Sequence, residues 1–235
     1  MTRHELKAQD EITTKLQSFT EIAVTRKKEI LLAAAVVVAI VLAYVGWGFY
    51  SNRRTASAQN QLAAAIAAYS DPVLPSDKAR YEKTIQEAQT TVDSYRSLPA
   101  AAIAKYYIGL SQEGLGDTAK ATQTLQEVIS EGDATTKAVA QFALAGIYQK
   151  HGDGQKAVDV LKQLSDSGGY SASAVTYELG KVHEANKQPD QAKGYYEKIV
   201  KEFADSPFRA DAEAGLRRMG FTVPTAPPAT PPNPS

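Results

Sequence analysis

Three segments of this 235-residue chain repeat one pattern of apolar, small and turn-forming residues. An alanine at the same place in each segment, Ala121, Ala157 or Ala192, gives spacings of 36 and 35 residues. A fixed period of roughly 20–50 residues is typical of arrays in which each unit buries its apolar face against the next one. The repetition therefore predicts a solenoid of stacked units. The segments cover residues 108–128, 144–164 and 179–199.

Each segment is expected to form two helices joined by a short turn. Apolar residues recur at helical spacing on either side of Gly116-Asp117, Gly152-Asp153 or Gln188-Pro189-Asp190. Glycine ends a helix readily and aspartate caps the start of the next one, so these residues mark the turn. The shared alanine falls on the second helix, where two antiparallel helices approach too closely for a larger side chain. The packing face behind it repeats as Leu125/Val128, Leu161/Leu164 and Tyr196/Ile199.

Segments outside the three repeats complete the predicted stack. Residues 56–69 and 77–96 form an incomplete first pair of helices, separated by two prolines within 71–75. Ser206-Pro207 opens a last helix that ends near Met219 and caps the solenoid, because proline suits the first turn of a helix. We therefore predict a solenoid at 56–220, with repeats at about 102–135, 138–171 and 173–206, a cap at 207–219 and a proline-rich disordered tail at 221–235.

An uncharged stretch near the N-terminus is the second constraint on this chain. The 21 residues from Ile30 to Tyr50 carry no charge, and at about 1.5 Å per residue a helix of this length spans a bilayer core of about 30 Å. Rings of the kind found at membrane interfaces end the stretch, and an arginine pair follows. We predict a transmembrane helix at 29–51 after a leader at 1–28. The rings and arginines are Tyr44, Trp47, Phe49, Tyr50, Arg53 and Arg54.

The basic residues around this stretch predict its orientation. More of them precede it than directly follow it, which favours a cytoplasmic N-terminus and, in a bacterium, a periplasmic C-terminal domain. We therefore expect a single-pass protein of the bacterial inner membrane, whose N-terminal helix contacts the lipid bilayer. The preceding residues are Arg3, Lys7, Lys15, Arg26, Lys27 and Lys28.

Other interpretations of the N-terminal region stay open. Ala56-Ser57-Ala58 resembles a signal-peptide cleavage site, although the apolar core is longer than usual and an arginine pair precedes the site. A buried core helix would require 21 uncharged residues to be covered on every face. Residues 4–28 carry a short apolar stripe, typical either of a partner-binding or membrane-surface helix or of a solvated leader.

Composition and motifs argue against catalysis. Equal numbers of basic and acidic residues, 26 of each, give no electrostatic attraction to nucleic acid, and the lack of cysteine excludes thiolate chemistry and Cys-ligated zinc. His4, His151 and His183 lie far apart, and no second histidine follows His183-Glu184 at the spacing of a zinc protease. The glycine-rich turns lack the Gly-Lys-Ser/Thr of a phosphate loop. We therefore predict a non-enzyme, with no catalytic residue, cofactor, metal, nucleic acid or small-molecule substrate.

The repeated residues resemble the tetratricopeptide repeat, a helix-turn-helix unit of about 34 residues with a Leu-Gly-x-x-Tyr pattern, a turn and a close-packing alanine. Leu144, Tyr148, Gly152 and Ala157 fit this pattern best. The tryptophan of the pattern is missing from all three repeats, and its tyrosine is replaced in the other two. The resemblance implies an all-α chain: one N-terminal transmembrane helix followed by a tetratricopeptide-type solenoid. The replacing residues are Gln112 and His183.

The resemblance also implies where partners bind. Tyr106, Phe142 and Tyr177 share one position of the three first helices, and by resemblance this position faces the concave side of the solenoid. A row of rings there could grip an apolar segment of another protein, or the rings could simply pack against the next repeat; both interpretations stay open. The rest of this candidate protein-binding groove is Leu110, Lys150, Lys181 and Glu184.

The order of parts is similar to that of the ancillary subunit of the bacterial Sec translocon. This resemblance implies a membrane-anchored interaction module that assists protein export and hands exported clients to periplasmic chaperones. Ser97-Leu98-Pro99-Ala100 and residues 203–210 also resemble repeats of outer-membrane-assembly lipoproteins and of the periplasmic cell-division coordinator. These segments imply the alternative of a scaffold for an envelope complex. The chain has no cysteine to carry lipid, so its helix would be the anchor.

The lack of native cysteine makes the predicted orientation testable. Ser167→Cys adds one thiol in a predicted loop between repeats. An impermeant maleimide should label it in cells whose outer membrane alone is permeable, because the basic residues favour a periplasmic domain. The cysteine-free chain is the control. Labelling that requires lysis of the inner membrane would contradict the orientation.

Overall fold

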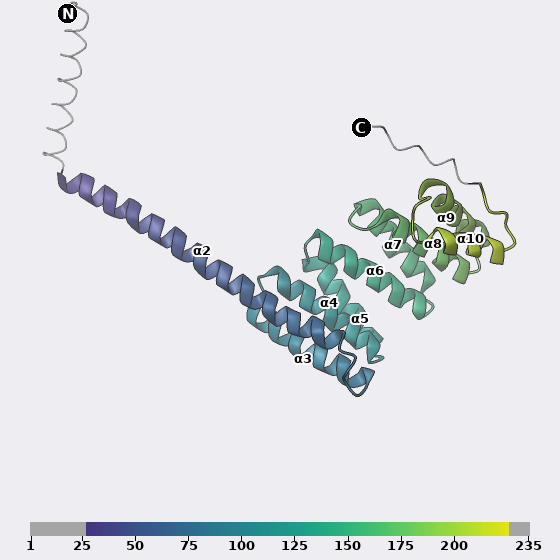
Figure 1. Ribbon diagram of the computed structural model, residues 1–235, viewed down its shortest axis with the longest axis horizontal. Helices are drawn as coiled ribbons and strands as arrows, with labels where there is room; N and C mark the ends of the chain where they lie inside the picture. The colour runs from purple at the N-terminus through teal and green to yellow at the C-terminus, as the bar shows by residue number, and fades with distance from the viewer. Residues whose placement is uncertain (1–26, 226–235) are drawn as a thin grey trace, which may run out of the picture. The chain divides into compact units, whose positions relative to one another are not determined.

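The computed structural model describes residues 27–225, and every regular element among them is an α-helix (Figure 1). The prediction of an all-α chain is confirmed for these residues. The chain divides into two compact units, one ending at Ala56 and the other beginning at Ser57. Most of the predicted leader lies outside the described residues. The helices are α2 (Lys27–Tyr69), α3 (Asp77–Tyr95), α4 (Pro99–Gly114), α5 (Thr118–Glu131), α6 (Ala134–Lys150), α7 (Gly154–Ser167), α8 (Ala172–Ala185), α9 (Pro189–Glu202) and α10 (Arg209–Arg218).

The first unit contains the N-terminal part of α2, where apolar side chains are exposed along the helix. Leu32 is 71% exposed and Trp47 is 72% exposed. In the described part of the chain, one helix is long and apolar enough to cross a membrane, and none of its apolar window is buried inside the structure. The segment is therefore not covered in the way that a core helix of a soluble protein would be.

The second unit is a stack in which each helix from α3 to α10 packs against the next one in sequence, and α4 also contacts α6 (Figure 1). The end of α2 belongs to this stack, because Ala58 and Leu62 share a core cluster with Ala88 and Val92 of α3. Further clusters follow along the chain, as expected of a solenoid whose units contact only their neighbours.

Close helix contact depends on the repeated alanine. Ala121, Ala157 and Ala192 are fully buried, as predicted for the point where the two helices of a repeat meet. Glycine does the same at one contact of α4 with α5, where a Cβ atom on Gly109 would lie 2.9 Å from Cγ of Leu125. Larger side chains at these positions would force the helices apart.

Positive-φ residues end the first helices, as predicted for two of the three repeats. Gly116 and Gly152 have φ angles of 82° and 83°. The third turn has no glycine, and Lys187 takes a φ of 57° instead. The N–H of Lys187 donates to the carbonyl of Glu184 at 3.1 Å, as that of Gly116 donates to Glu113 at 3.0 Å. The hydrogen bonds of the turn therefore outweigh the steric cost of a left-handed lysine.

The aspartates after these glycines occupy N-cap positions without capping the next helix. Neither Asp117 nor Asp153 accepts a hydrogen bond from a helix N–H with its side chain. Their carboxylates instead pair with Lys120 at 2.6 Å and Lys156 at 2.9 Å. The predicted capping role is wrong because a lysine one turn into the helix competes for the same carboxylate.

The last helix begins later than predicted. Helix α10 starts at Arg209, so the prediction that Pro207 lies in its first turn is wrong. The hydroxyl of Ser206 accepts a hydrogen bond from the N–H of Phe208 at 3.2 Å, which places Pro207 in a separate turn. Helix α4 starts at Pro99, earlier than the predicted first repeat, because proline suits a first turn. The bounds of the repeats themselves stay predictions.

The start of the predicted tail contacts the last helices. Phe221 and Val223 pack against the core cluster of α9 and α10, and the N–H of Phe221 donates to the carbonyl of Leu216 at 2.9 Å. The ammonium of Lys193 lies 5.1 Å from the centre of the Phe221 ring. Residues 226–235 of the predicted tail lie outside the described residues.

The ring of Tyr196, on α9, packs between α8 and α10. A Cβ atom on Gly180 or on Gly215 would lie 2.6 Å from this ring, so only glycine lets α8 and α10 approach it this closely. The ring is fully buried, and its hydroxyl donates to Glu184 Oε2 at 2.6 Å. Burial of the phenol, followed by this hydrogen bond, raises the pKa of Tyr196.

Replacing Tyr196 with Phe should lower the free energy of unfolding at neutral pH by about 1.5 kcal/mol, because a hydrogen bond to a charged carboxylate is lost. The neutral phenol contributes fully to the free energy of unfolding below pH 10.0, the ordinary pKa that applies in the unfolded chain. This contribution is lost as the pH rises toward the raised pKa of the folded chain. The stability difference between wild type and variant should therefore shrink above about pH 10. Thermal unfolding followed by far-ultraviolet circular dichroism measures both effects.

Tyr195→Phe is the matched control for this experiment. The ring of Tyr195 is only half-buried, and its hydroxyl makes no hydrogen bond with a described residue. This variant should melt like wild type at neutral pH. A stability loss for Tyr196→Phe that stays constant across the alkaline range would contradict the proposed titration.

Candidate functional site

The three aromatic residues predicted to form a row lie on successive first helices. Tyr106 is on α4, Phe142 is on α6 and Tyr177 is on α8, and all three are half-buried. Part of each ring packs against a core cluster of the stack. We call the surface formed by α4, α6 and α8 around these rings the first-helix face. The packing interpretation thus accounts for part of each ring and leaves the rest accessible.

Two rings of the row are covered by an aromatic residue just before the next first helix. Phe142 stacks on Tyr170, which precedes α8, with 4.5 Å between ring centroids. Tyr177 stacks on Phe208, which precedes α10, at 5.1 Å. Such pairs add about 0.5–1.5 kcal/mol beyond the area that they bury. These contacts lie within the chain, so they occupy one face of Phe142 and of Tyr177.

Tyr106 is not stacked in this way but belongs to a group of tyrosines that contact one another in turn. We call this group the tyrosine cluster; its members are Tyr69, Tyr81, Tyr106 and Tyr107. Its ring meets Tyr107 edge-on at 5.4 Å, and Tyr107 meets Tyr69 edge-on at 5.3 Å. Tyr69 also contacts Tyr81, from α3, at 6.0 Å. Burial, followed by the nearby phenols, raises the pKa of Tyr106 to about 12. Tyr106 therefore stays neutral at physiological pH, with an apolar ring and a hydroxyl that can donate or accept.

Two cavities open on the first-helix face. The α4–α6 cavity has a volume of about 360 Å³, and the α6–α8 cavity has a volume of about 300 Å³. The structure therefore brings Tyr106 to one cavity, and Phe142 together with Lys181 to the other, whereas Leu110 and Tyr177 line neither. The α4–α6 cavity is lined by Ile103, Tyr106, Tyr107, Thr135, Thr136 and Val139, and the α6–α8 cavity by Phe142, Ala145, Gly146, Gln149, Leu161, Glu178 and Lys181.

Lys150, predicted to line the groove, instead joins the ends of α4 and α6. Its ammonium donates to Glu113 Oε1 at 2.7 Å, and Nε2 of His151 lies 2.9 Å from the same oxygen. The hydroxyl of Thr118 donates to Glu113 Oε2 at 2.9 Å. Burial of the Glu113 carboxyl opposes its ionisation, but these hydrogen bonds outweigh burial and lower its pKa. Lys150 therefore links two successive first helices. We call such a polar link between first helices a clasp.

Glu184 forms a similar clasp between α8 and α10. Both of its oxygens accept hydrogen bonds from the Arg218 guanidinium at 3.1 Å, and Oε2 also accepts one from Tyr196. Burial of the Glu184 carboxyl opposes ionisation, but the hydrogen bonds from Arg218 and Tyr196 outweigh it and lower its pKa. The structure thus gives this predicted groove residue a role in holding the repeats together.

Lys181 is the predicted polar residue that does line a cavity of the first-helix face. Its ammonium donates to both oxygens of Glu178 at 3.0 Å and lies 5.6 Å from the centre of the Tyr177 ring. The pair is only partly exposed and carries no net charge. It can therefore give a bound polypeptide one donor and one acceptor without a strong preference for either sign of charge.

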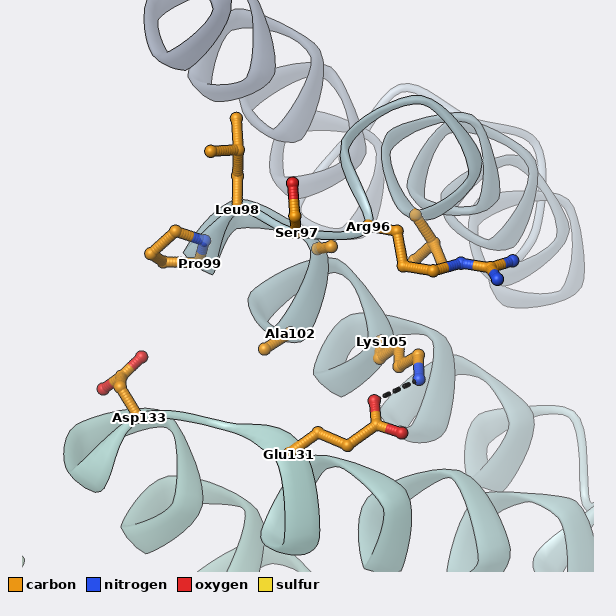
Figure 2. Close-up of a pocket in the computed structure, with 10 residues that line it drawn as sticks. Arg96, Ser97, Leu98, Pro99, Ala102, Lys105, Glu131 and Asp133 are labelled. Atoms are coloured by element: carbon orange, nitrogen blue, oxygen red, sulfur yellow. Dashed lines mark hydrogen bonds and ion pairs between the residues drawn. The ribbon is translucent and has the colours of Figure 1, made fainter. Parts of the chain in front are cut away.

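A third cavity, of about 230 Å³, was not predicted from the sequence (Figure 2). It lies between the α3–α4 turn and the α5–α6 turn, and Lys105 reaches across it from α4 to Glu131 at 2.7 Å. The carboxylate of Asp133 accepts hydrogen bonds from the N–H groups of Thr135 and Thr136, and so caps α6. Lys105, Glu131 and Asp133 are thus satisfied within the chain, which makes this cavity a weak candidate site.

No metal site occurs among the residues that the structure describes, since no cluster of three or more His, Asp or Glu side chains could hold an ion. His183, the residue closest to a zinc-protease pattern, is buried. Its Nδ1 lies 2.6 Å from Gln188 Oε1, and its ring stacks on Tyr195 at 5.3 Å. Packing and this hydrogen bond account for the histidine without a ligand.

Sequence reasoning missed most of the residues around Tyr106. Tyr69, Tyr81 and Tyr107 come from three helices, and Thr135 and Val139 come from a fourth. Aligning one position per helix could identify the row but could not show which other side chains reach it. The available signal was compositional, because 12 of the 235 residues are tyrosine.

Comparison with known proteins agrees with the helical-repeat fold. Tetratricopeptide-like repeats of nearly identical sequence from a Podosopora anserina protein named for kinesin light chain superimpose with a TM-score of 0.55 at 20% identity, over 68% of this chain and 84% of that one. A single-substitution variant of that protein gives the same values. At this identity, the likeness shows the fold alone.

The comparison with curated proteins gives no match. The sequence profile of one family, the tetratricopeptide repeat-like domain, matches residues 27–212. Domains of this kind are typically non-catalytic scaffolds for protein–protein interaction. Since the match covers well over half of its length, this chain belongs to the tetratricopeptide repeat-like domain family.

Proposed function

We propose that this protein is anchored in a bacterial inner membrane through α2 and binds polypeptide segments on its first-helix face. The observation that carries the proposal is the pair of cavities on that face, one beside Tyr106 and Tyr107, the other beside Phe142 and Lys181. Tyrosine offers a large contact area at low cost in conformational entropy and is enriched at the energetic centres of protein interfaces.

The arrangement of the two cavities along the repeats favours a polypeptide over a small molecule as the ligand. They follow one another along successive repeats, so an extended or helical chain can contact both. A small-molecule site usually combines one deep apolar pocket with several converging polar groups. Here Glu178 and Lys181 are bound to each other, and Thr136 donates its hydroxyl hydrogen to Asp133 at 2.7 Å.

Three observations support the membrane anchor. The large apolar side chains of the first unit are exposed, as a lipid environment would favour. The guanidinium of Arg53 lies 4.5 Å from the centre of the Phe49 ring, a pairing suited to a membrane interface. Ala58, which would end the possible signal-peptide cleavage site, is fully buried in a helix of the second unit. The excess of basic residues before the helix supports a cytoplasmic N-terminus and periplasmic repeats.

Within the envelope, we assign this protein to the Sec translocon, where it would receive exported clients and pass them to periplasmic chaperones. The assignment rests on the order of parts: a leader, one apolar helix and tetratricopeptide-like repeats. The competing assignment is a scaffold in outer-membrane assembly or cell division. It rests on the likeness of residues 97–100 and 203–210 to repeats of such proteins.

Site-specific cross-linking in bacterial cells tests both the binding face and the partner. A photoreactive benzoylphenylalanine replaces Val139 in the α4–α6 cavity or Lys181 in the α6–α8 cavity, and the adducts are identified by mass spectrometry. We expect adducts with the Sec channel and several exported proteins from both positions. One stoichiometric envelope protein would favour the scaffold assignment instead.

The matched control places the same photoreactive residue at Gln163, an exposed position of the second helix α7. Adducts at this position should be at least about tenfold rarer, since binding hot spots of 2 kcal/mol or more are expected only on the first-helix face. Equal yields at all three positions, or adducts at Gln163 alone, would contradict the proposed binding face.

A further inference from the structure

We infer that the α4–α6 cavity is a subsite for one uncharged aromatic side chain, Phe or Tyr, of a bound polypeptide. That side chain would take the place that Tyr170 and Phe208 take in the next two repeats. The inference rests on the proposed function, because it assigns a preferred residue to the same first-helix face.

Stacked ring pairs recur in the second and third repeats. Each ring of the row faces the start of the next first helix: Phe142 meets Tyr170 at 4.5 Å, and Tyr177 meets Phe208 at 5.1 Å. The two ring planes are 22° apart in the first pair and 14° apart in the second. In both repeats, the chain itself supplies a parallel ring.

The first repeat lacks this covering ring. With the 36-residue spacing of Ala121 and Ala157, Ala134 occupies the position that corresponds to Tyr170. Ala134 is exposed and has only a methyl side chain, and the next residue, Thr135, lines the cavity. Tyr106 therefore borders a cavity at the place where the next two repeats hold an aromatic ring.

The size and charge of the cavity fit such a ring. Its volume of about 360 Å³ exceeds the roughly 150 Å³ in which an apolar cavity can hold benzene. None of its six lining residues is charged, so the complementary occupant is an uncharged side chain. The hydroxyls of Tyr106 and Thr135 can serve a phenol or a nearby peptide group.

The subsite is continuous with the rest of the proposed binding face. Val139, which lines the cavity, lies about one helical turn before Phe142 on α6, so the stack of Phe142 and Tyr170 lies near the same opening. On its other side, Tyr107 of the tyrosine cluster lines the cavity. A peptide that inserts one ring beside Tyr106 can therefore also contact the stack of Phe142 and Tyr170.

Peptide binding to the full chain in lipid nanodiscs tests the inference. The probes are blocked hexapeptides of sequence Gly-Ser-X-Gly-Ser-Gly, with X as 4-fluorophenylalanine, Leu or Asp. Fluorine line broadening gives the affinity of the aromatic peptide, and competition gives the affinities of the others. We expect the aromatic peptide to bind at least threefold more tightly than the Leu peptide, and the Asp peptide not to compete.

Two variants locate the binding. Ala134→Tyr supplies the missing ring and should weaken binding of the aromatic peptide at least tenfold while leaving the chain as stable as wild type or more so. Val139→Lys places a charge in the same cavity and should weaken binding to a similar extent. Thr90→Tyr, at an exposed position of α3, is the matched control and should bind like wild type.

Unchanged affinity in both cavity variants, or equal affinity for all three peptides, would overturn the subsite. Absence of measurable binding by the aromatic peptide would also overturn it. The outcome for the proposed function is separate: cross-links at Lys181 that persist in Ala134→Tyr would keep the first-helix face as the binding surface, whereas their absence in wild type would remove both.

Discussion

Close approach of helices at alanine and glycine is the contact on which this structure depends. Ala121, Ala157 and Ala192 are fully buried at equivalent points of three repeats, and no longer side chain could occupy those points without moving a helix. In the third repeat, Gly180 and Gly215 likewise allow close contact, because the ring of Tyr196 packs directly against both glycines. Such contacts fix the rotation of each helix about its axis as well as its distance from the next. They therefore decide which residues of α4, α6 and α8 face outward together.

The first-helix face follows from that register. Polar clasps at the ends of the first helices hold successive repeats at a fixed offset, through Glu113 with Lys150 and Glu184 with Arg218. With the offset fixed, each ring of the row meets the start of the following first helix. Aromatic residues close that position twice, and alanine leaves it open beside Tyr106. A difference of one residue type between repeats thus turns an internal packing position into an opening on the surface.

The repeated pattern was enough to predict the helix-turn-helix units, the buried alanines and the glycines with positive φ, because each depends on neighbours within one repeat. The pattern also predicted that the row of Tyr106, Phe142 and Tyr177 lies on three successive first helices. Polar roles were predicted less well: Lys150 and Glu184 bond to residues more than 30 positions away, and Asp117 and Asp153 turn to a nearby lysine instead of capping a helix. The tyrosine cluster could not be predicted, because it assembles from three helices whose contacts depend on tertiary packing. Lys187 shows the same limit, since only the hydrogen bonds of the turn explain its left-handed backbone.

The measurement that tests this account most directly is the stability of Ala157→Leu against Ala119→Leu. Ala157 is fully buried between the helices of the second repeat, whereas Ala119 is exposed on the second helix of the first repeat. Both changes add the same atoms to a helix, so their difference isolates the close contact. Overpacking predicts that Ala157→Leu loses about 1–3 kcal/mol and melts several degrees below wild type, while Ala119→Leu melts within about a degree of it. Equal melting temperatures for the two variants and wild type would show that the helices do not depend on alanine here, and would contradict the register from which the first-helix face was derived.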